Sequence, residues 1–185
     1  MDNGASSYRR FLDGDENGIV RIIKEYKDGL ILYLNGFVRN VHTAEELAEE
    51  TFVKLVVKRP KFSKNSAFKT WLYAIGRNAA IDYLRRNSKM SVTSIDDYRN
   101  IRSDEEGMEQ SYIREERKII IHRALKNLKS EYHQVLYLIY FEGFDNKQAA
   151  AVMKKSSRQI ENLVYRAKIS LKSELDKEGF RHEEL

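Results

Sequence analysis

Cysteine is absent from this sequence, and proline occurs only once. Without cysteine the chain forms no disulfide and offers no thiolate for a zinc cluster or for nucleophilic catalysis. One proline and nine glycines in 185 residues leave few breaks in long helices. No apolar run approaches the roughly 20 residues of a membrane-spanning helix, and the N-terminal segment lacks the apolar core of a signal peptide. We therefore expect an all-α, cytoplasmic protein with no membrane insertion.

The net charge of +5 is unevenly distributed along the chain. Residues 1–90 carry +5, residues 91–117 carry −4, and residues 118–185 carry +4. The stretch 53–89 holds ten basic residues and one acid, Asp82. Such concentrated positive charge is typical of a phosphate-binding surface, although a solvated basic face has the same composition.

Apolar periodicity divides the chain into two helical parts. Segment 88–111 is rich in Ser, Asp, Arg and Glu and shows no sustained period, so we interpret it as a flexible linker. It separates two small helical domains, predicted at 1–87 and 112–185. Thr43 with Glu46 has the spacing of a capping box at the start of one helix. Apolar residues at spacings of three and four predict helices over 16–40, 43–58, 66–86, 112–127 and 130–139.

The most informative segment begins at Asp145. Asp145 with Gln148 and Ser156 with Gln159 have the spacing of two capping boxes, which predict a short helix over 146–153, a tight turn and a second helix. This is the arrangement of a helix-turn-helix, whose second helix enters the major groove of DNA, although a solvated helical hairpin is the alternative. Arginine suits guanine, asparagine suits adenine, and lysines in the turn suit phosphate. The predicted contacts are Lys154, Lys155, Ser156, Ser157, Arg158, Gln159, Glu161, Asn162, Tyr165 and Arg166.

Three segments resemble the extracytoplasmic-function (ECF) branch of the bacterial sigma-70 family of RNA polymerase sigma factors. Residues 125–175 resemble region 4, whose helix-turn-helix binds the minus-35 promoter element. The run from Thr43 to Phe52 (TAEELAEETF) resembles the core-binding helix of region 2. The run from Phe68 to Arg86 (FKTWLYAIGRNAAIDYLRR) resembles the helix that melts and recognises the minus-10 element. The likeness covers most of the chain except its ends and linker, and separate motifs in the family's order make it specific.

The resemblance implies a set of partners and a first binding surface. The partners are promoter DNA, core RNA polymerase through its β′ and β subunits, and an anti-sigma factor, with the chain itself a monomer. Four acids on one helix are also typical of a solvated face, and Glu46 also fits the capping box. The residues implied for polymerase binding are Glu46, Leu47, Glu49, Glu50 and Val53.

A second surface is expected for the minus-10 element. A loop of small polar and basic residues can hold a base that has left the stack, which stabilises melted DNA without ATP. Asp82 could equally pair with Arg85 or Arg86 on its own helix. Trp71 could stack on a base, but its spacing with Phe68 favours core packing. The residues expected at the minus-10 element are Lys61, Ser63, Lys64, Asn65, Ser66, Asn78, Asp82, Arg85 and Arg86.

Catalytic motifs are not evident in the sequence. The four histidines are scattered without metal-ligand spacing, and no glycine-rich phosphate loop or nucleophile motif occurs. We expect a protein that is not an enzyme and uses no metal or cofactor. Two alternatives remain open: a helix-turn-helix regulator that binds a palindrome as a dimer without polymerase, and a helical interaction protein with a solvated basic face.

Overall fold

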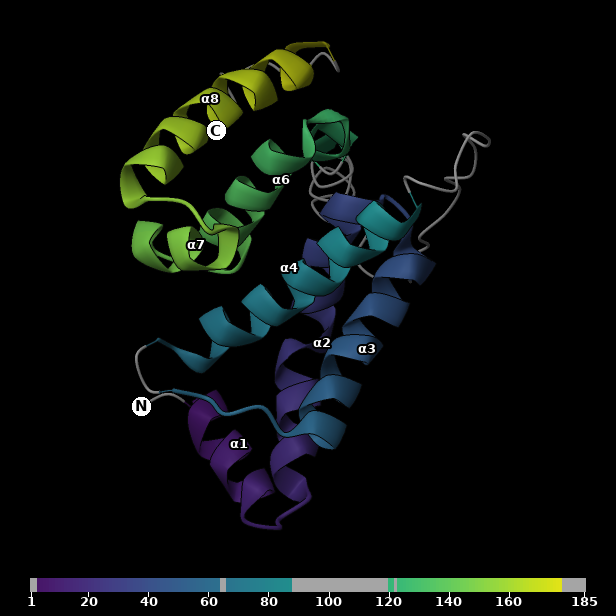
Figure 1. Cartoon of the computed structure of the whole chain (residues 1–185). Coiled ribbons are helices and arrows are strands. Elements are labelled where there is room, and N and C mark those ends of the chain that lie inside the picture. The colour runs from purple at the N-terminus through teal and green to yellow at the C-terminus, as the bar shows by residue number, and fades with distance from the viewer. Residues whose placement is uncertain (1–2, 64–65, 88–119, 122, 178–185) are drawn as a thin grey trace, which may run out of the picture.

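The computed structural model describes residues 3–63, 66–87, 120–121 and 123–177, and its elements are all helical. The N-terminal domain consists of α1 (Asn3–Leu12), α2 (Asn17–Val38), α3 (Val41–Lys58) and α4 (Phe68–Asn87). The C-terminal domain contains α6 (Ser130–Leu136), the π-helical turn η1 (Tyr137–Phe141), α7 (Asn146–Met153) and α8 (Ser157–Lys177). The predicted all-α, two-domain architecture is confirmed (Figure 1). The predicted linker, and most of the helix expected over 112–127, lie outside the described residues.

Helix α2 is the centre of the N-terminal domain, with α1, α3 and α4 packed around it. Its side chains at spacings of three and four are almost fully buried, as the sequence period predicts. They are Ile19, Ile22, Tyr26, Leu30, Leu34 and Phe37. None of the described helices is both long and apolar enough to cross a membrane.

In the N-terminal domain one local expectation was wrong and one helix was not predicted. Helix α3 begins at Val41, capped by Asn40, whose side chain accepts a hydrogen bond from the Thr43 backbone N–H. Asparagine is among the strongest N-cap residues and stands three positions ahead of Thr43, so the Thr43 to Glu46 capping box does not form. Helix α1 was not expected at all, because its buried face combines only Tyr8 and Phe11 with the small residues Gly4 and Ser7.

The helix-turn-helix is confirmed, with both capping boxes in place. Asp145 Oδ1 accepts from the Gln148 backbone N–H at 2.7 Å, and the Gln148 side chain accepts in return from the Asp145 backbone N–H. Ser156 and Gln159 form the same reciprocal pair at the start of α8. Lys154 makes the turn in the left-handed conformation, with φ 54°. The N-terminal ends of α7 and α8 are therefore fixed by hydrogen bonds between residues three positions apart in the sequence.

The two domains pack against each other, which the sequence did not indicate. Helix α7 lies against α4, and α6 lies against α2, so both helices separate α8 from the N-terminal domain (Figure 1). The Lys69 ammonium on α4 pairs with the Glu142 carboxylate at 2.7 Å and donates to the Glu142 carbonyl oxygen at 2.8 Å. Lys69 also lies over the Phe144 ring, at 5.3 Å from its centroid. These contacts join the start of α4 to the segment between η1 and α7.

A second set of contacts joins the C-terminal end of α2 to α6. Arg39 donates to the Leu128 carbonyl oxygen at 3.0 Å, and the Ser130 hydroxyl donates to the Gly36 carbonyl oxygen at 3.1 Å. Gly36 permits this approach, because a Cβ atom there would overlap the His133 ring. Apolar packing accompanies these polar contacts, since the ring centroids of Tyr73 and Phe144 lie 5.4 Å apart and those of Tyr33 and Tyr137 lie 6.3 Å apart. The buried apolar residues of the two domains therefore form one continuous cluster.

We expect Lys69→Met to destabilise the protein by about 1–3 kcal/mol, because it leaves the Glu142 carboxylate, only 10% exposed, without its cation. Urea unfolding of the full chain measures this loss. Lys27→Met, an exposed substitution on α2, is the matched control and should change the free energy of unfolding by less than about 0.5 kcal/mol. Equal losses in the two variants would show that the Lys69 contact adds nothing to the stability of the folded chain.

Candidate nucleic-acid interface

The N-terminal half of α8 presents a polar face to solvent. Ile160 and Ala167 are buried and pin the helix against its domain, so the residues between them on the opposite side point outward. Arg158, Gln159, Glu161, Asn162, Tyr165 and Arg166 are exposed, and Ser157 is half-buried. Helix α8 lies on the side of α6 and α7 away from the N-terminal domain. Its outer face is therefore open to a duplex even with the two domains packed together, which we call the closed arrangement.

The two lysines in the turn before α8, Lys154 and Lys155, have different surroundings. Lys154 is exposed, whereas Lys155 is half-buried and pairs with the Glu131 carboxylate of α6 at 3.0 Å. Ser156 is the N-cap of α8 and holds the first turn of that helix. Lys154 is therefore the more available of the two cations for a phosphate, and Lys155 helps to fix the turn.

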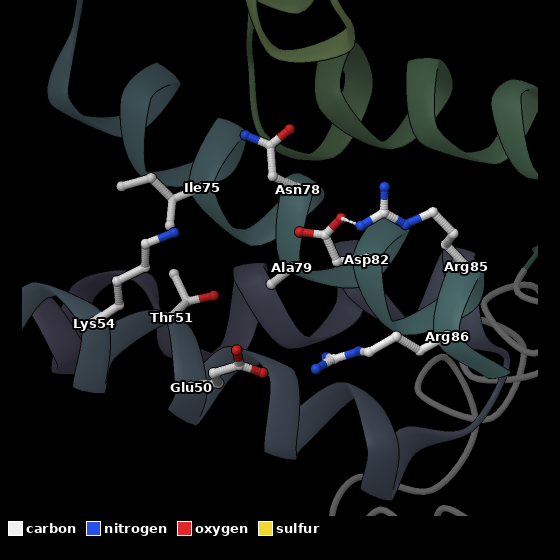
Figure 2. Close-up of a pocket in the computed structure, with 9 residues that line it drawn as sticks. All are labelled: Glu50, Thr51, Lys54, Ile75, Asn78, Ala79, Asp82, Arg85 and Arg86. Carbon is white, nitrogen blue, oxygen red and sulfur yellow. Dashed lines mark ion pairs between the residues drawn. The ribbon is translucent and has the colours of Figure 1, made fainter.

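A cleft of about 210 Å³ lies between α3 and α4. Figure 2 shows Glu50, Thr51 and Lys54 of α3 on one side, facing Asn78, Asp82 and Arg86 of α4 on the other. The structure thus brings Glu50, expected at the polymerase surface, together with residues expected at the minus-10 element. Lys54 was missed by the sequence analysis, since no local pattern separates it from the other exposed lysines.

The expected residues of α4 and its preceding loop lie at the surface of the N-terminal domain. Asp82 and Arg85 are exposed and form an ion pair at 3.3 Å, which is the alternative that the sequence left open for Asp82. An exposed pair of this kind contributes little to stability and leaves both groups accessible. Lys61, Ser63, Ser66 and Arg86 are exposed and Asn78 is half-buried, whereas Lys64 and Asn65 lie outside the described residues.

The outer face of α3 combines acids with valines. Glu46, Glu49, Glu50 and Val53 are exposed, and Glu49 and Glu50 form no ion pair in the described part of the chain. Leu47, by contrast, is only 3% exposed and belongs to the core, so it supports this face from inside. Val56 and Val57, at 40% and 73% exposure, extend the face beyond the expected residues. They could have been found from their position outside the buried stripe of Leu47, Thr51 and Leu55.

Trp71 belongs to an aromatic cluster of the N-terminal domain, as its spacing predicts. Its ring centroid lies 5.5 Å from that of Phe68 and 5.3 Å from that of Phe62. Burial raises the pKa of the neighbouring Tyr8 hydroxyl, with Arg59 opposing the shift, so this phenol is neutral at pH 7 and able to donate. Among the described residues, His42 lies at the surface and His133 stacks on Tyr137, and no group of three metal-ligating side chains is present.

The comparisons with known families match both domains. The family model for sigma-70 region 2 matches residues 22–90, and the model for sigma-70 region 4 matches residues 118–171. The chain is 30% identical over 156 residues to the ECF RNA polymerase sigma factor SigM of Bacillus subtilis, covering 84% of this chain and 93% of that protein. It is 26% identical over 162 residues to the RNA polymerase sigma factor YlaC of the same species, covering 87% and 94%.

Solved structures show the same fold. A complex of CnrH with the cytosolic domain of CnrY matches with a TM-score of 0.64 at 19% identity, covering 95% of this chain and 96% of that one. The sigma factor RpoE in complex with the anti-sigma factor NepR from Bartonella quintana matches with a TM-score of 0.68 at 23% identity, covering 84% and 95%. The likeness therefore includes both helical domains and is not confined to the helix-turn-helix.

Proposed function

Because this chain belongs to the ECF branch of the sigma-70 family of RNA polymerase sigma factors, we propose specific surfaces through which it engages core polymerase and two promoter elements. A sigma factor directs promoter-specific initiation by binding core polymerase and promoter DNA. The observation that carries the assignment is that region 2 and region 4 of the family both match this chain, in the family's order. A regulator that has only a helix-turn-helix would not contain the region 2 domain. We assign domains to residues 1–87 and 112–185, with the linker at 88–111.

The polymerase-binding surface is the outer face of α3. Glu46, Glu49 and Glu50 supply negative charge, and Val53 with Val57 supplies an exposed apolar end. Over the twelve residues from Glu46 to Val57 a helix rises about 16 Å, a length suited to one helix of a partner. Leu47 contributes from the core by fixing the helix in place. The proposed partner element is the pair of clamp helices of the β′ subunit, and the β subunit is proposed as a further partner.

The minus-10 surface comprises the exposed loop residues Lys61, Ser63 and Ser66 and the exposed side of α4. Lys64 and Asn65 complete the proposed loop. Asn78, Asp82 and Arg86 line the cleft of Figure 2, where an amide and two opposite charges offer donors and acceptors to the edge of an unpaired base. Arg85 supplies positive charge for the strand backbone beside them. Because binding energy alone holds the strand open, melting needs no ATP.

The minus-35 surface is the exposed half of α8. Arg158 and Asn162 are four residues apart and share one outward face, which places a guanine reader and an adenine reader side by side in the major groove. The other proposed contacts on this face are Ser156, Ser157, Gln159, Glu161, Tyr165 and Arg166. Lys154 is the main proposed phosphate contact at the turn, and Lys155, which pairs with Glu131, is a secondary one. The Ser156 and Gln159 capping box fixes the first turn of α8, and the buried Ile160 and Ala167 hold the helix against its domain.

Simultaneous use of the two DNA surfaces requires the domains to separate. The two promoter elements lie about 25 base pairs apart, or about 85 Å at 3.4 Å per pair. In the closed arrangement α7 lies between α4 and α8, and packed helices are only about 10 Å apart. The closed arrangement therefore suits the free protein, and the linker lets the domains reach both elements on polymerase.

Further features of the proposal follow from the family. We propose a cytoplasmic monomer that is not an enzyme and needs no cofactor, because the chemistry of initiation belongs to polymerase. We also propose an anti-sigma partner, since one of the structural relatives was solved with one. Such a partner would act by preventing the polymerase and DNA surfaces from being used.

Transcription with purified components tests the proposed function. The full chain is added to core RNA polymerase with fragments of genomic DNA, and transcript starts are mapped. We expect starts at a small set of sites that share two motifs at constant spacing, and none with core polymerase alone. The absence of any chain-dependent start, together with no binding to core polymerase, would overturn the proposal.

A further inference from the structure

The loop between α3 and α4 is fastened to the N-terminal domain at two points. Its described residues are 60–63 and 66–67, and exposure alternates along the first four: Pro60 and Phe62 are half-buried, whereas Lys61 and Ser63 are exposed. Phe62 packs edge-on against Phe68, with centroids 5.6 Å apart. Lys61 and Ser63 are the side chains proposed to contact the minus-10 strand. Their positions depend on how Pro60 and Phe62 hold the loop backbone against the domain.

The second fastening comes from α1, through Tyr8. The Tyr8 hydroxyl donates to the Pro60 carbonyl oxygen at 2.9 Å, across 52 positions of sequence. Tyr8 is 1% exposed, and its ring centroid lies 5.5 Å from that of Phe68 and 5.4 Å from that of Trp71. Two rigid ring contacts thus fix the direction in which the hydroxyl points. Among the described hydrogen bonds, this is the one that ties the loop backbone to a side chain of α1.

Helix α1 itself is held closely enough to act as a fixed support. A Cβ atom on Gly4 would overlap the Phe68 ring, and a Cβ atom on Gly18 would overlap the backbone of α1 at Ser7. Phe11 lies under the Arg59 guanidinium, 5.0 Å from its ring centroid, directly before the loop. Helix α1 therefore packs against α2, the start of α4 and the end of α3 at once.

We propose that Tyr8 is a positioning residue for the minus-10 element, through which α1 sets the backbone of the Pro60 loop before DNA arrives. The inference rests on the proposed function of that loop. A loop of this length held at fewer points samples more conformations, and ordering it on binding costs affinity. Fixing the Pro60 carbonyl in advance removes part of that cost, and Lys61 and Ser63 then present a ready-made contact to the strand.

Tyr8→Phe tests the inference, because it removes the hydroxyl and keeps the ring contacts. The probe is the single-stranded non-template minus-10 segment of a promoter mapped by transcript starts, and the protein is the full chain bound to core polymerase. We expect affinity for this strand to fall about 2- to 10-fold, the range for one lost hydrogen bond. Affinity for core polymerase and for a minus-35 duplex should stay within 2-fold of the parent protein.

Tyr33→Phe is the matched control, because it also removes one hydroxyl from a buried tyrosine of the same domain. The Tyr33 hydroxyl has no hydrogen-bond partner in the described part of the chain, and the residue lies on α2 away from the loop. It should leave strand affinity unchanged. Phe62→Leu releases the other fastening and should reduce strand affinity in the same selective way as Tyr8→Phe, which covers the case in which Tyr8→Phe folds poorly.

The outcomes distinguish a failure of the positioning role of Tyr8 from a failure of the proposed minus-10 binding by the loop. If the parent holoenzyme does not bind the minus-10 strand, the proposed function of the loop fails and the role of Tyr8 fails with it. If the parent binds and Tyr8→Phe behaves like Tyr33→Phe, only the positioning role is wrong. A loss shared equally by polymerase, minus-35 and minus-10 binding would also overturn it, because it would indicate a general effect on the fold.

Discussion

Reversing two acids on α3, in the variant Glu46→Lys with Glu49→Lys, is expected to weaken binding to core polymerase at least about 30-fold. Both side chains are exposed and lie on the face that ends in Val53 and Val57. If that face meets a basic partner surface, each reversal replaces an attraction by a repulsion, and losing charge pairs at an interface costs about 2–5 kcal/mol. Fluorescence titration of labelled protein with core polymerase measures the change directly.

A control pair with the same spacing and the same change of charge is available on α2. Glu25→Lys with Asp28→Lys also alters two exposed acids three positions apart. It should lower polymerase affinity no more than about 3-fold, through the general rise in positive charge. Comparable losses in the two double variants would mean that α3 is not the docking surface, and Glu46 and Glu49 would then belong to a merely solvated face.

The second large effect is expected at Arg158 on the recognition helix. Arg158→Ala should weaken holoenzyme binding to a minus-35 duplex by about 1–3 kcal/mol, or about 5- to 150-fold, and should relax the preference at one base pair. Lys154→Ala should act differently, lowering affinity for all sequences alike and reducing the salt slope by about 1. Duplexes carrying each base substitution, titrated at several salt concentrations, distinguish base contacts from phosphate contacts.

A control for Arg158 lies farther along the same helix. Lys172 is exposed on α8, beyond the half that faces the proposed groove. Lys172→Ala should change duplex affinity by less than about 2-fold, although it removes the same charge. If Arg158→Ala weakens every duplex equally and keeps the base preference of the parent, the residue contacts phosphate and the proposed base reading is wrong.

The sequence predicted most accurately the elements whose signals are local. Helix α7 was predicted at its observed bounds, because the Asp145 and Ser156 boxes are formed by residues three positions apart. The start of α3 was misplaced by the same kind of signal, since Thr43 has the right spacing but Asn40 competes for the same backbone donors. Capping patterns therefore locate a helix end only when no stronger cap stands nearby.

Features that depend on distant pairs could not be predicted. Lys69 and Glu142 are 73 positions apart, and neither residue is unusual in its own segment. The π-helical turn η1 shifts the register after Tyr137, and periodicity over so few residues does not reveal it. For the proposed surfaces, the sequence supplied the residue types and the family resemblance, while burial separated Leu47 from Val53 and added Val57. Which of the assigned residues touch DNA or polymerase remains a prediction.

The contact between Lys69 and Glu142 has a consequence for how tightly the free protein holds DNA. A ligand that needs the domains apart binds only the separated fraction, so its apparent dissociation constant equals the intrinsic one divided by that fraction. With about 1% of molecules separated, a promoter would be bound about 100-fold more weakly than the two surfaces allow. A partner that favours separation then raises promoter affinity by the same factor without touching the DNA. The Lys69 ammonium group on α4 thereby helps to set the fraction of free molecules whose domains are separated, and with it the affinity of the free protein for a promoter.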